Sequence, residues 1–360
     1  MSYSKKIYKK DSKGKIRVLH VYTKNADLIS LSGLIDGKLS EDRSTSISKN
    51  IGKVNETTPT EQAIFEANAK IQSKMSEGYF ETVKEAENNI VILPMLAKDY
   101  KKESHKVTFP CYAQPKLDGQ RALGAKFIPM ISRKGKKIDT MSHIQKDLDG
   151  LALNKGVYID GELYAHGLSF QENMKLIKKY REGETEKVKF HVYDIVMDAP
   201  FKERYTTLSA LVLPFDNVEL VPTVVINNEA QLKEIHQIYL KQGYEGTIVR
   251  HSDATYGVNK RDSQLLKYKD FIDIACKVID IVPSDKRPEQ GVCVCELDTP
   301  KGKSTFHTGM KFSHTEREQI LANKGKYVSQ MAEIRFFEYT DDGMPRFPVC
   351  VGFRLDHFRL

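Results

Sequence analysis

The residues best suited to chemistry stand in the string KLDGQR, at positions 116–121, which follows a β-like stretch. A lysine amine attacks a phosphorus centre only when it is partly deprotonated, and nearby cations or burial lower its pKa enough for that. Gly119 has no side chain and would let the backbone come close to a nucleotide. The string is short enough to occur by chance, and the alternative is a surface Lys116 beside a turn Asp118.

Three carboxylates are candidates for holding a metal ion. Asp160 and Glu162 alternate in a β-like string, so both side chains are predicted to lie on one face of a strand. With Glu245 they form a set of hard oxygen ligands suited to Mg²⁺. A solvated strand edge is the usual reading of such a pair, but we favour a metal site because Lys116 lies upstream.

Two further strings carry basic and aromatic side chains at suggestive positions. Lys267 and Lys269 also alternate and are predicted to share one face of a strand, where they would meet phosphates. Without the other strings they would be ordinary charges on a strand edge. Tyr193 ends an aromatic-rich β-like string and is either a platform for a nucleotide base or plain core packing.

Three blocks of sequence must position these residues, and together they predict a multidomain α+β protein. Residues 1–88 begin with β-like stretches and continue in a helix from Pro59, with Thr58 and Glu61 as a capping box. Residues 89–272 alternate strands with helices, which we expect at 170–180 and 229–242. Residues 273–360 are mostly strands with one helix around 316–323, as in an OB-fold β-barrel.

Composition excludes several classes of protein. No apolar run approaches the length of a membrane span, so we expect a soluble, intracellular protein without a membrane partner. Five cysteines without a CxxC pair argue against a zinc site or a disulfide framework. Cys293 and Cys295 are predicted to be small buried side chains on one face of a strand. The net charge of +8 is consistent with a polyanionic partner.

Taken in order along the chain, these strings resemble the motifs of the covalent nucleotidyltransferases, and specifically of ATP-dependent DNA ligases. Residues 116–121 are similar to the family's nucleotidyl-lysine motif, and Ser132-Arg133 resembles its second element. The remaining elements are matched by residues 160–163, 190–194, 245–249 and 267–269, and by 346–348 with Gly352, Arg354 and Asp356. The resemblance covers about residues 92–360.

The resemblance implies an ATP-grasp-like adenylation domain followed by an OB-fold domain. It implies that Lys116 takes AMP from ATP and passes it to the 5′-phosphate of a nick, which the 3′-hydroxyl then attacks. Catalytic roles fall to Lys116, Asp118, Arg121, Lys267 and Lys269. ATP is assigned to Lys116, Arg121, Glu162, Tyr193, Glu245, Lys267, Lys269 and Arg354, the metal to Asp160, Glu162 and Glu245, and DNA to Arg121, Ser132 and Arg133.

The implied partners are ATP, Mg²⁺ and nicked duplex DNA, in replication, repair or recombination, and we expect a monomer. The final element departs from the family, because many cellular ligases place a lysine after Asp356 and this chain has His357. The role of orienting pyrophosphate therefore rests on Arg354. An RNA ligase, an mRNA-capping guanylyltransferase or a non-catalytic nucleic-acid-binding protein remain alternatives.

The first block resembles, over residues 5–80, a WGR-type module that binds nucleic acid. Gly52-Lys53 stands near the position of that module's Gly-Arg pair, but the chain contains no tryptophan. Residues 1–24 carry eight basic side chains against one acidic, which suits contacts with phosphates. The alternative is a structural cap on the catalytic domain.

Overall fold

The computed structural model describes the whole chain except residues 1, 12–13, 89–91, 213–214, 286 and 355–360. Asp356 and His357, which the sequence placed in the last ligase-like element, therefore lie outside the described residues. The chain divides into two units, Met1–Lys269 and Asp270–Leu360, each described by itself below. None of the helices in the described part is long and apolar enough to cross a membrane. The predicted division into three domains, at residues 88 and 272, stays a prediction.

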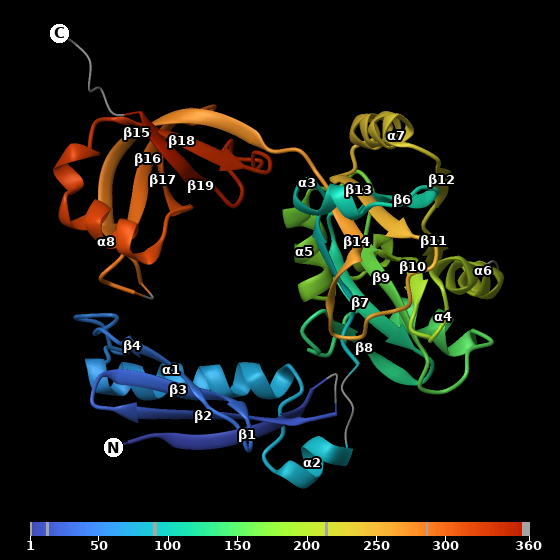
Figure 1. The fold of residues 1–360 in the computed structure, drawn as a ribbon, viewed down its shortest axis with the longest axis horizontal. Coiled ribbons are helices and arrows are strands. Elements are labelled where there is room, and N and C mark those ends of the chain that lie inside the picture. The colour runs from blue at the N-terminus through green and yellow to red at the C-terminus, as the bar shows by residue number, and fades with distance from the viewer. Residues whose placement is uncertain (1, 12–13, 89–91, 213–214, 286, 355–360) are drawn as a thin grey trace. The chain divides into compact units, whose positions relative to one another are not determined.

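The N-terminal block is an antiparallel meander covered by one long helix (Figure 1). Its strands, β1 to β4, pair in chain order and are Ser4–Lys10, Ile16–Lys24, Asp27–Leu34 and Ser40–Thr45. Helix α1, Pro59–Ser76, begins at the predicted capping box: the Thr58 hydroxyl accepts from the Glu61 amide, and the Glu61 carboxylate accepts from the Thr58 amide. Ile71 on its apolar side shares a buried core with Ile7 and Val21 of the meander. Helix α2, Val83–Asn88, follows.

The described residues after α2 in the first unit contain two five-stranded sheets. The first has the order β11-β10-β9-β7-β8, and the second has the order β12-β6-β13-β14-β5. The strands of the first sheet are β7 Gln120–Ala125, β8 Ile128–Ser132, β9 Tyr158–Tyr164, β10 Lys189–Ile195 and β11 Val218–Leu220. The strands of the second are β5 Leu96–Asp99, β6 Cys111–Lys116, β12 Val224–Ile226, β13 Gly246–His251 and β14 Arg261–Tyr268.

Helices pack on the apolar faces of these sheets. The first sheet shares a core with α4, α5 and α6, which are Ser142–Gly150, Phe170–Lys178 and Phe201–Val212. The second shares a core with α3, Tyr100–Glu103, and α7, Glu229–Lys241. The predicted helices at 170–180 and 229–242 are confirmed with slightly earlier ends. Helices α4 and α6 were not predicted.

The second unit consists mainly of five strands that close into a barrel, in the order β15-β16-β17-β19-β18. They are β15 Ile272–Pro283, β16 Gly291–Thr299, β17 Gly302–Met310, β18 Met331–Phe336 and β19 Val349–Arg354, with helix α8 at His314–Ala322. Cys293 and Cys295 both face the buried core, as their alternation predicted. All five cysteines are free thiols.

Candidate active site

A cavity of about 270 Å³ lies where strands of the two five-stranded sheets face each other. Most of its charged lining comes from the strings singled out in the sequence. The lining contains seven basic and two acidic side chains: Lys116, Arg121, Arg133, Arg250, Arg261, Lys267 and Lys269, with Glu162 and Glu245. A cavity with this balance of charge is suited to a polyanion such as a nucleoside triphosphate.

Lys116 is the last residue of β6, and strand pairing sets it beside Glu245. The backbone of β6 pairs with β13 so that Lys116 lies opposite Gly246, and the Glu245 amide donates to the Lys116 carbonyl at 2.9 Å. Their side chains form an ion pair, and the second carboxylate oxygen of Glu245 lies 3.3 Å from Lys269 Nζ. One carboxylate therefore holds two lysines at the cavity.

Gly246 is required for this arrangement. Its φ of +151° is a backbone conformation that residues other than glycine rarely adopt. An added Cβ would lie 2.4 Å from the Tyr268 carbonyl oxygen. Directly after this glycine, Thr247 faces α7, where its hydroxyl lies 3.0 Å from His236 Nδ1. Glu245, directly before it, lines the cavity.

Lys267 and Lys269 line the cavity together, as their alternation predicted. Tyr268, between them, is stacked on the other side of the strand against His236 at 3.8 Å and Tyr100 at 4.7 Å between ring centroids. This aromatic stack fixes the side of β14 that faces the cavity. Burial and then the neighbouring Lys269 lower the pKa of Lys267.

Arg121, Glu162 and Tyr193 form the other side of the cavity. Arg121 and Glu162 lie opposite each other on β7 and β9, and Tyr193 lies on β10. The Arg121 guanidinium is 5.7 Å from the centre of the Tyr193 ring. The Tyr193 hydroxyl lies 3.4 Å from Glu162 Oε2. Burial raises the pKa of Glu162 to about 8, against the opposing effect of Lys116 and Arg121.

Asp160 is fully buried, and both of its carboxylate oxygens are engaged. Arg121 donates to Oδ1 from Nε at 2.9 Å and to Oδ2 from Nη2 at 2.6 Å. Tyr256 donates to Oδ2 as well, at 2.6 Å. Among the described residues no group of three or more His, Cys, Asp or Glu side chains is arranged to hold a metal ion. In this structure Asp160 is the ion-pair partner of Arg121, and its predicted metal role stays a prediction.

Models of two protein domains match this chain, by the descriptions "ATP dependent DNA ligase domain" over residues 94–269 and "DNA ligase OB-like domain" over residues 289–354. Two regions of the chain are therefore similar to domains of the ATP-dependent DNA ligases. The first match contains the whole cavity, and the second contains most of the barrel.

Curated relatives and solved structures agree with these matches. The chain is 26% identical to the DNA ligase of Enterobacteria phage T4 over 304 residues, which are 66% of this chain and 62% of the phage protein. It is 26% identical to the DNA ligase of an African swine fever virus isolate (Warthog/Namibia), covering 85% of this chain and 78% of that one. The structure of a Lig E DNA ligase superposes with a TM-score of 0.61 at 25% identity, covering 74% of this chain and all of that one.

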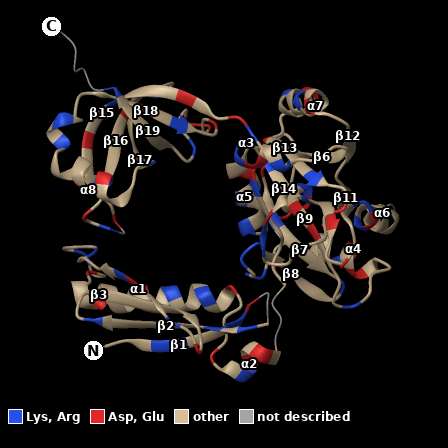
Figure 2. Ribbon diagram, viewed as in Figure 1, with Lys and Arg blue, Asp and Glu red and all other residues tan. Residues whose placement is uncertain are grey.

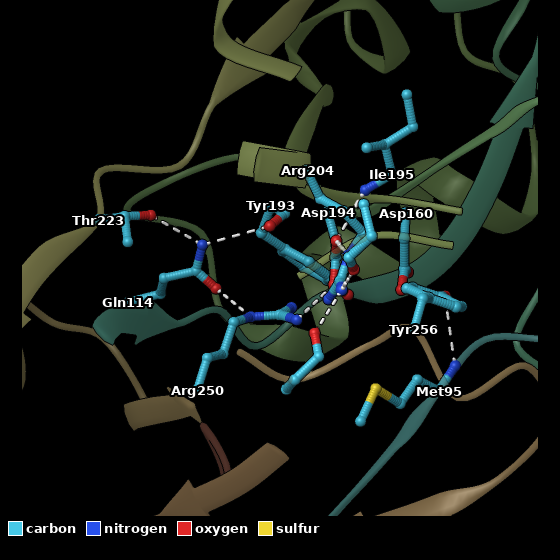
Figure 3. A network of polar contacts seen from close by, with 12 residues as sticks. Met95, Gln114, Asp160, Tyr193, Asp194, Ile195, Arg204, Thr223, Arg250 and Tyr256 are labelled. Atoms are coloured by element: carbon cyan, nitrogen blue, oxygen red, sulfur yellow. Dashed lines mark hydrogen bonds and ion pairs between the residues drawn. The ribbon is translucent and has the colours of Figure 1, made fainter. Parts of the chain in front are cut away.

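The region matched to the ligase domain also contains a buried polar network that the sequence did not predict (Figure 3). Asp194 pairs with Arg204, whose Nε lies 2.7 Å from Oδ1, and with Arg250, whose Nη1 lies 2.5 Å from Oδ2. Arg250 donates from Nε to Gln114 at 2.7 Å, and both side chains line the cavity. The only local signal was that Arg250 follows a predicted strand directly.

Of the remaining predicted residues, Arg133 also lines the cavity, and burial followed by the nearby Arg121 lowers its pKa. Ser132 shapes the turn after β8, where its hydroxyl accepts from the Lys136 amide at 3.1 Å. Asp118 lies in the turn between β6 and β7. Arg354 lies in the OB-like domain, where Nε donates to Glu333 at 3.1 Å.

Proposed function

We propose that this chain is an ATP-dependent DNA ligase, which seals nicks between a 3′-hydroxyl and a 5′-phosphate in duplex DNA through a covalent Lys116–AMP intermediate. The observation that carries the proposal is the position of Lys116, which lies in a strongly basic cavity of the region matched to a DNA ligase domain. It contacts Glu245 and shares the cavity with Glu162. Because the chain spans 62% of the length of the phage relatives, the whole activity is a proposal for this chain.

In the first step the Lys116 amine attacks the α-phosphorus of ATP, an N–P bond forms, and the bond to the pyrophosphate oxygen breaks. The ion pair with Glu245 engages this amine in the free protein, so the nucleotide must weaken that pair before the amine can attack. Lys267 and Lys269 would then stabilise the charge on the leaving pyrophosphate. Arg354 would assist from the OB-like domain.

In the second step an oxygen of the DNA 5′-phosphate attacks the same phosphorus, and the bond to Lys116 breaks. Arg133 would hold that 5′-phosphate, with Arg121 beside it at the cavity. In the third step the 3′-hydroxyl attacks the 5′-phosphorus, AMP leaves, and the nick is closed. Asp118 is assigned to the orientation of the 3′ end.

Mg²⁺ fits two of the three predicted carboxylates. Glu162 and Glu245 both line the cavity, and Mg²⁺ is commonly held by one or two carboxylates together with substrate phosphates and water. When bound, the ion would neutralise charge on the phosphates of ATP. Burial raises the pKa of Glu162 to about 8, and a bound cation would favour the charged form that this ligand role requires.

The N-terminal block is proposed to be a WGR-like module that contacts DNA phosphates. Blue segments mark basic residues on β1 and α1 (Figure 2). Lys5 and Lys9 are used within the block, since they bond to Glu81 and to the Glu77 carbonyl. Exposed Lys6, Arg17 and Lys24 are therefore the better candidates. Replacing these three with alanine should reduce the salt dependence of DNA binding, and an unchanged slope would leave the block as a structural cap.

The deciding experiment is a sealing assay with ATP and Mg²⁺ on matched nicked duplexes, one all-DNA and one all-RNA. We expect the wild type to seal the DNA nick and Lys116→Ala to lose at least about 10³-fold in rate. Lys233→Ala, on the exposed surface of α7, is the control and should seal normally. Sealing of RNA alone would favour RNA repair, and no sealing would favour capping or a binding role.

A further inference from the structure

Arg121 presents only part of its guanidinium to the cavity. Its Nε and Nη2 atoms both donate to Asp160, so one edge of the planar group is held by one buried carboxylate. Nη1 has no hydrogen-bond partner among the residues that the structure describes, and the side chain lines the cavity. The direction in which Nη1 points is therefore set by the orientation of Asp160.

The orientation of Asp160 depends on the Tyr256 hydroxyl. This hydroxyl donates to Asp160 Oδ2 at 2.6 Å and accepts from the Met95 amide at 3.3 Å (Figure 3). Because the Met95 amide can only donate, the direction of the Tyr256 O–H bond toward Asp160 is fixed. Burial, followed by the charge of Asp160, keeps the pKa of Tyr256 well above its ordinary value, so the hydroxyl keeps its proton.

Tyr256 is itself held by several unrelated contacts. It is only 9% exposed and lies in the segment between β13 and β14. The Arg204 guanidinium lies 5.5 Å from the centre of its ring and donates from Nη1 to the Ala254 carbonyl, two residues earlier, at 2.6 Å. Tyr256 therefore contacts one member of each ion pair: Asp160 of the pair with Arg121, and Arg204 of the pair with Asp194. A tyrosine fixed in this way is a rigid support for the carboxylate that it contacts.

We propose that Tyr256 is a positioning residue of the ligase reaction, which acts through Asp160 to orient Arg121 at the cavity. This inference rests on the proposed function and adds a residue that does not itself line the cavity but contacts Asp160 of the 160–163 string. Tyr256→Phe removes one hydroxyl and leaves the ring, so the fold should persist while Asp160 and Arg121 gain freedom of movement.

The test is a double-mutant cycle on single-turnover sealing of the DNA nick. Tyr256→Phe should lower the sealing rate of the wild type about 10-fold. In an Arg121→Ala background the same change should lower the rate less than about 2-fold, because the residue that it positions is gone. Arg121→Lys serves as the background if Arg121→Ala does not fold. Tyr205→Phe, which loses a hydroxyl bond to the Val221 carbonyl, is the matched control and should change the rate less than about 2-fold.

Two results would overturn the inference while leaving the proposed function intact. In the first, Tyr256→Phe seals as fast as the wild type. In the second, Tyr256→Phe costs the same factor in both backgrounds, as expected if the tyrosine only supports the fold. A wild type that seals no nick would instead refute the proposed function on which the inference rests.

Discussion

Replacing Glu162 with glutamine should change how the stability of the free protein depends on pH. Burial raises the pKa of Glu162 from 4.5 to about 8, and the neighbouring carboxylates Glu245 and Asp160 act in the same direction. Glutamine keeps the size and shape of the side chain and removes the ionisation. The difference between the two proteins therefore isolates this one group.

The sign follows from where the proton is bound. Below pH 4.5 the carboxyl is protonated in both the folded and the unfolded protein, and its favourable contribution is fully present. Between pH 4.5 and about 8 only the folded protein keeps the proton, so the free energy of unfolding falls as the pH rises. Above about pH 8 the loss is complete.

The size of the effect has a ceiling of about 5 kcal/mol, because each pKa unit corresponds to about 1.36 kcal/mol. The carboxyl lines a cavity that water can enter, which weakens the cost of charging it. We therefore expect the stability of Glu162→Gln, relative to the wild type, to rise by about 2 to 3 kcal/mol between pH 5.5 and pH 8.5.

The measurement is differential scanning calorimetry of both proteins without ATP or Mg²⁺, since the chain has no tryptophan to report unfolding. Hydrogen exchange of β9 amides would assign the effect to the strand that carries Glu162. A stability difference that stays constant across this pH range would refute the reasoning. It would mean that Glu162 is already ionised in the folded protein at pH 5.5.

Three other changes have expected outcomes. Gly119→Ala places a Cβ 2.2 Å from a backbone carbonyl oxygen of β9 and should cost about 3 kcal/mol by thermal unfolding, whereas Gly309→Ala, with open space around it, should stay within about 0.5 kcal/mol; equal losses would contradict this. Arg204→Ala leaves buried Asp194 short of one partner and should cost about 3 to 5 kcal/mol by calorimetry, and a loss below about 1 kcal/mol would refute it. Arg354→Ala should slow lysine adenylation about 10²-fold and spare sealing of a pre-adenylated nick; equal loss of both steps would count against the assigned role.

Features that depend on neighbours within a few residues could be predicted from the sequence. The start of α1 follows from Thr58 and Glu61, which are three residues apart and satisfy each other's backbone amides. The shared face of Lys267 and Lys269 follows from the two-residue period of a strand. In both cases the determining contacts are local, so the sequence contains the necessary information.

The partners of the buried charges could not be predicted in the same way. Alternation correctly placed Asp160 on a strand with Glu162, but its partner Tyr256 lies 96 residues further along the chain. Arg250 and Gln114 are separated by 136 residues and meet only because β13 pairs with β6. Which polar side chain satisfies which depends on strand order and register, and no short pattern records these.

The seven basic side chains around the cavity also affect how the purified protein behaves in different buffers. An excess of fixed cations concentrates any small anion, so sulfate or phosphate from a buffer will compete with ATP for the same space. Titrations in chloride and in sulfate at equal ionic strength should therefore give different apparent affinities for the nucleotide. Under the proposed function, Lys116 would carry AMP on a fraction of the purified molecules. Pyrophosphate, which reverses the proposed first step, would return all of them to one starting state.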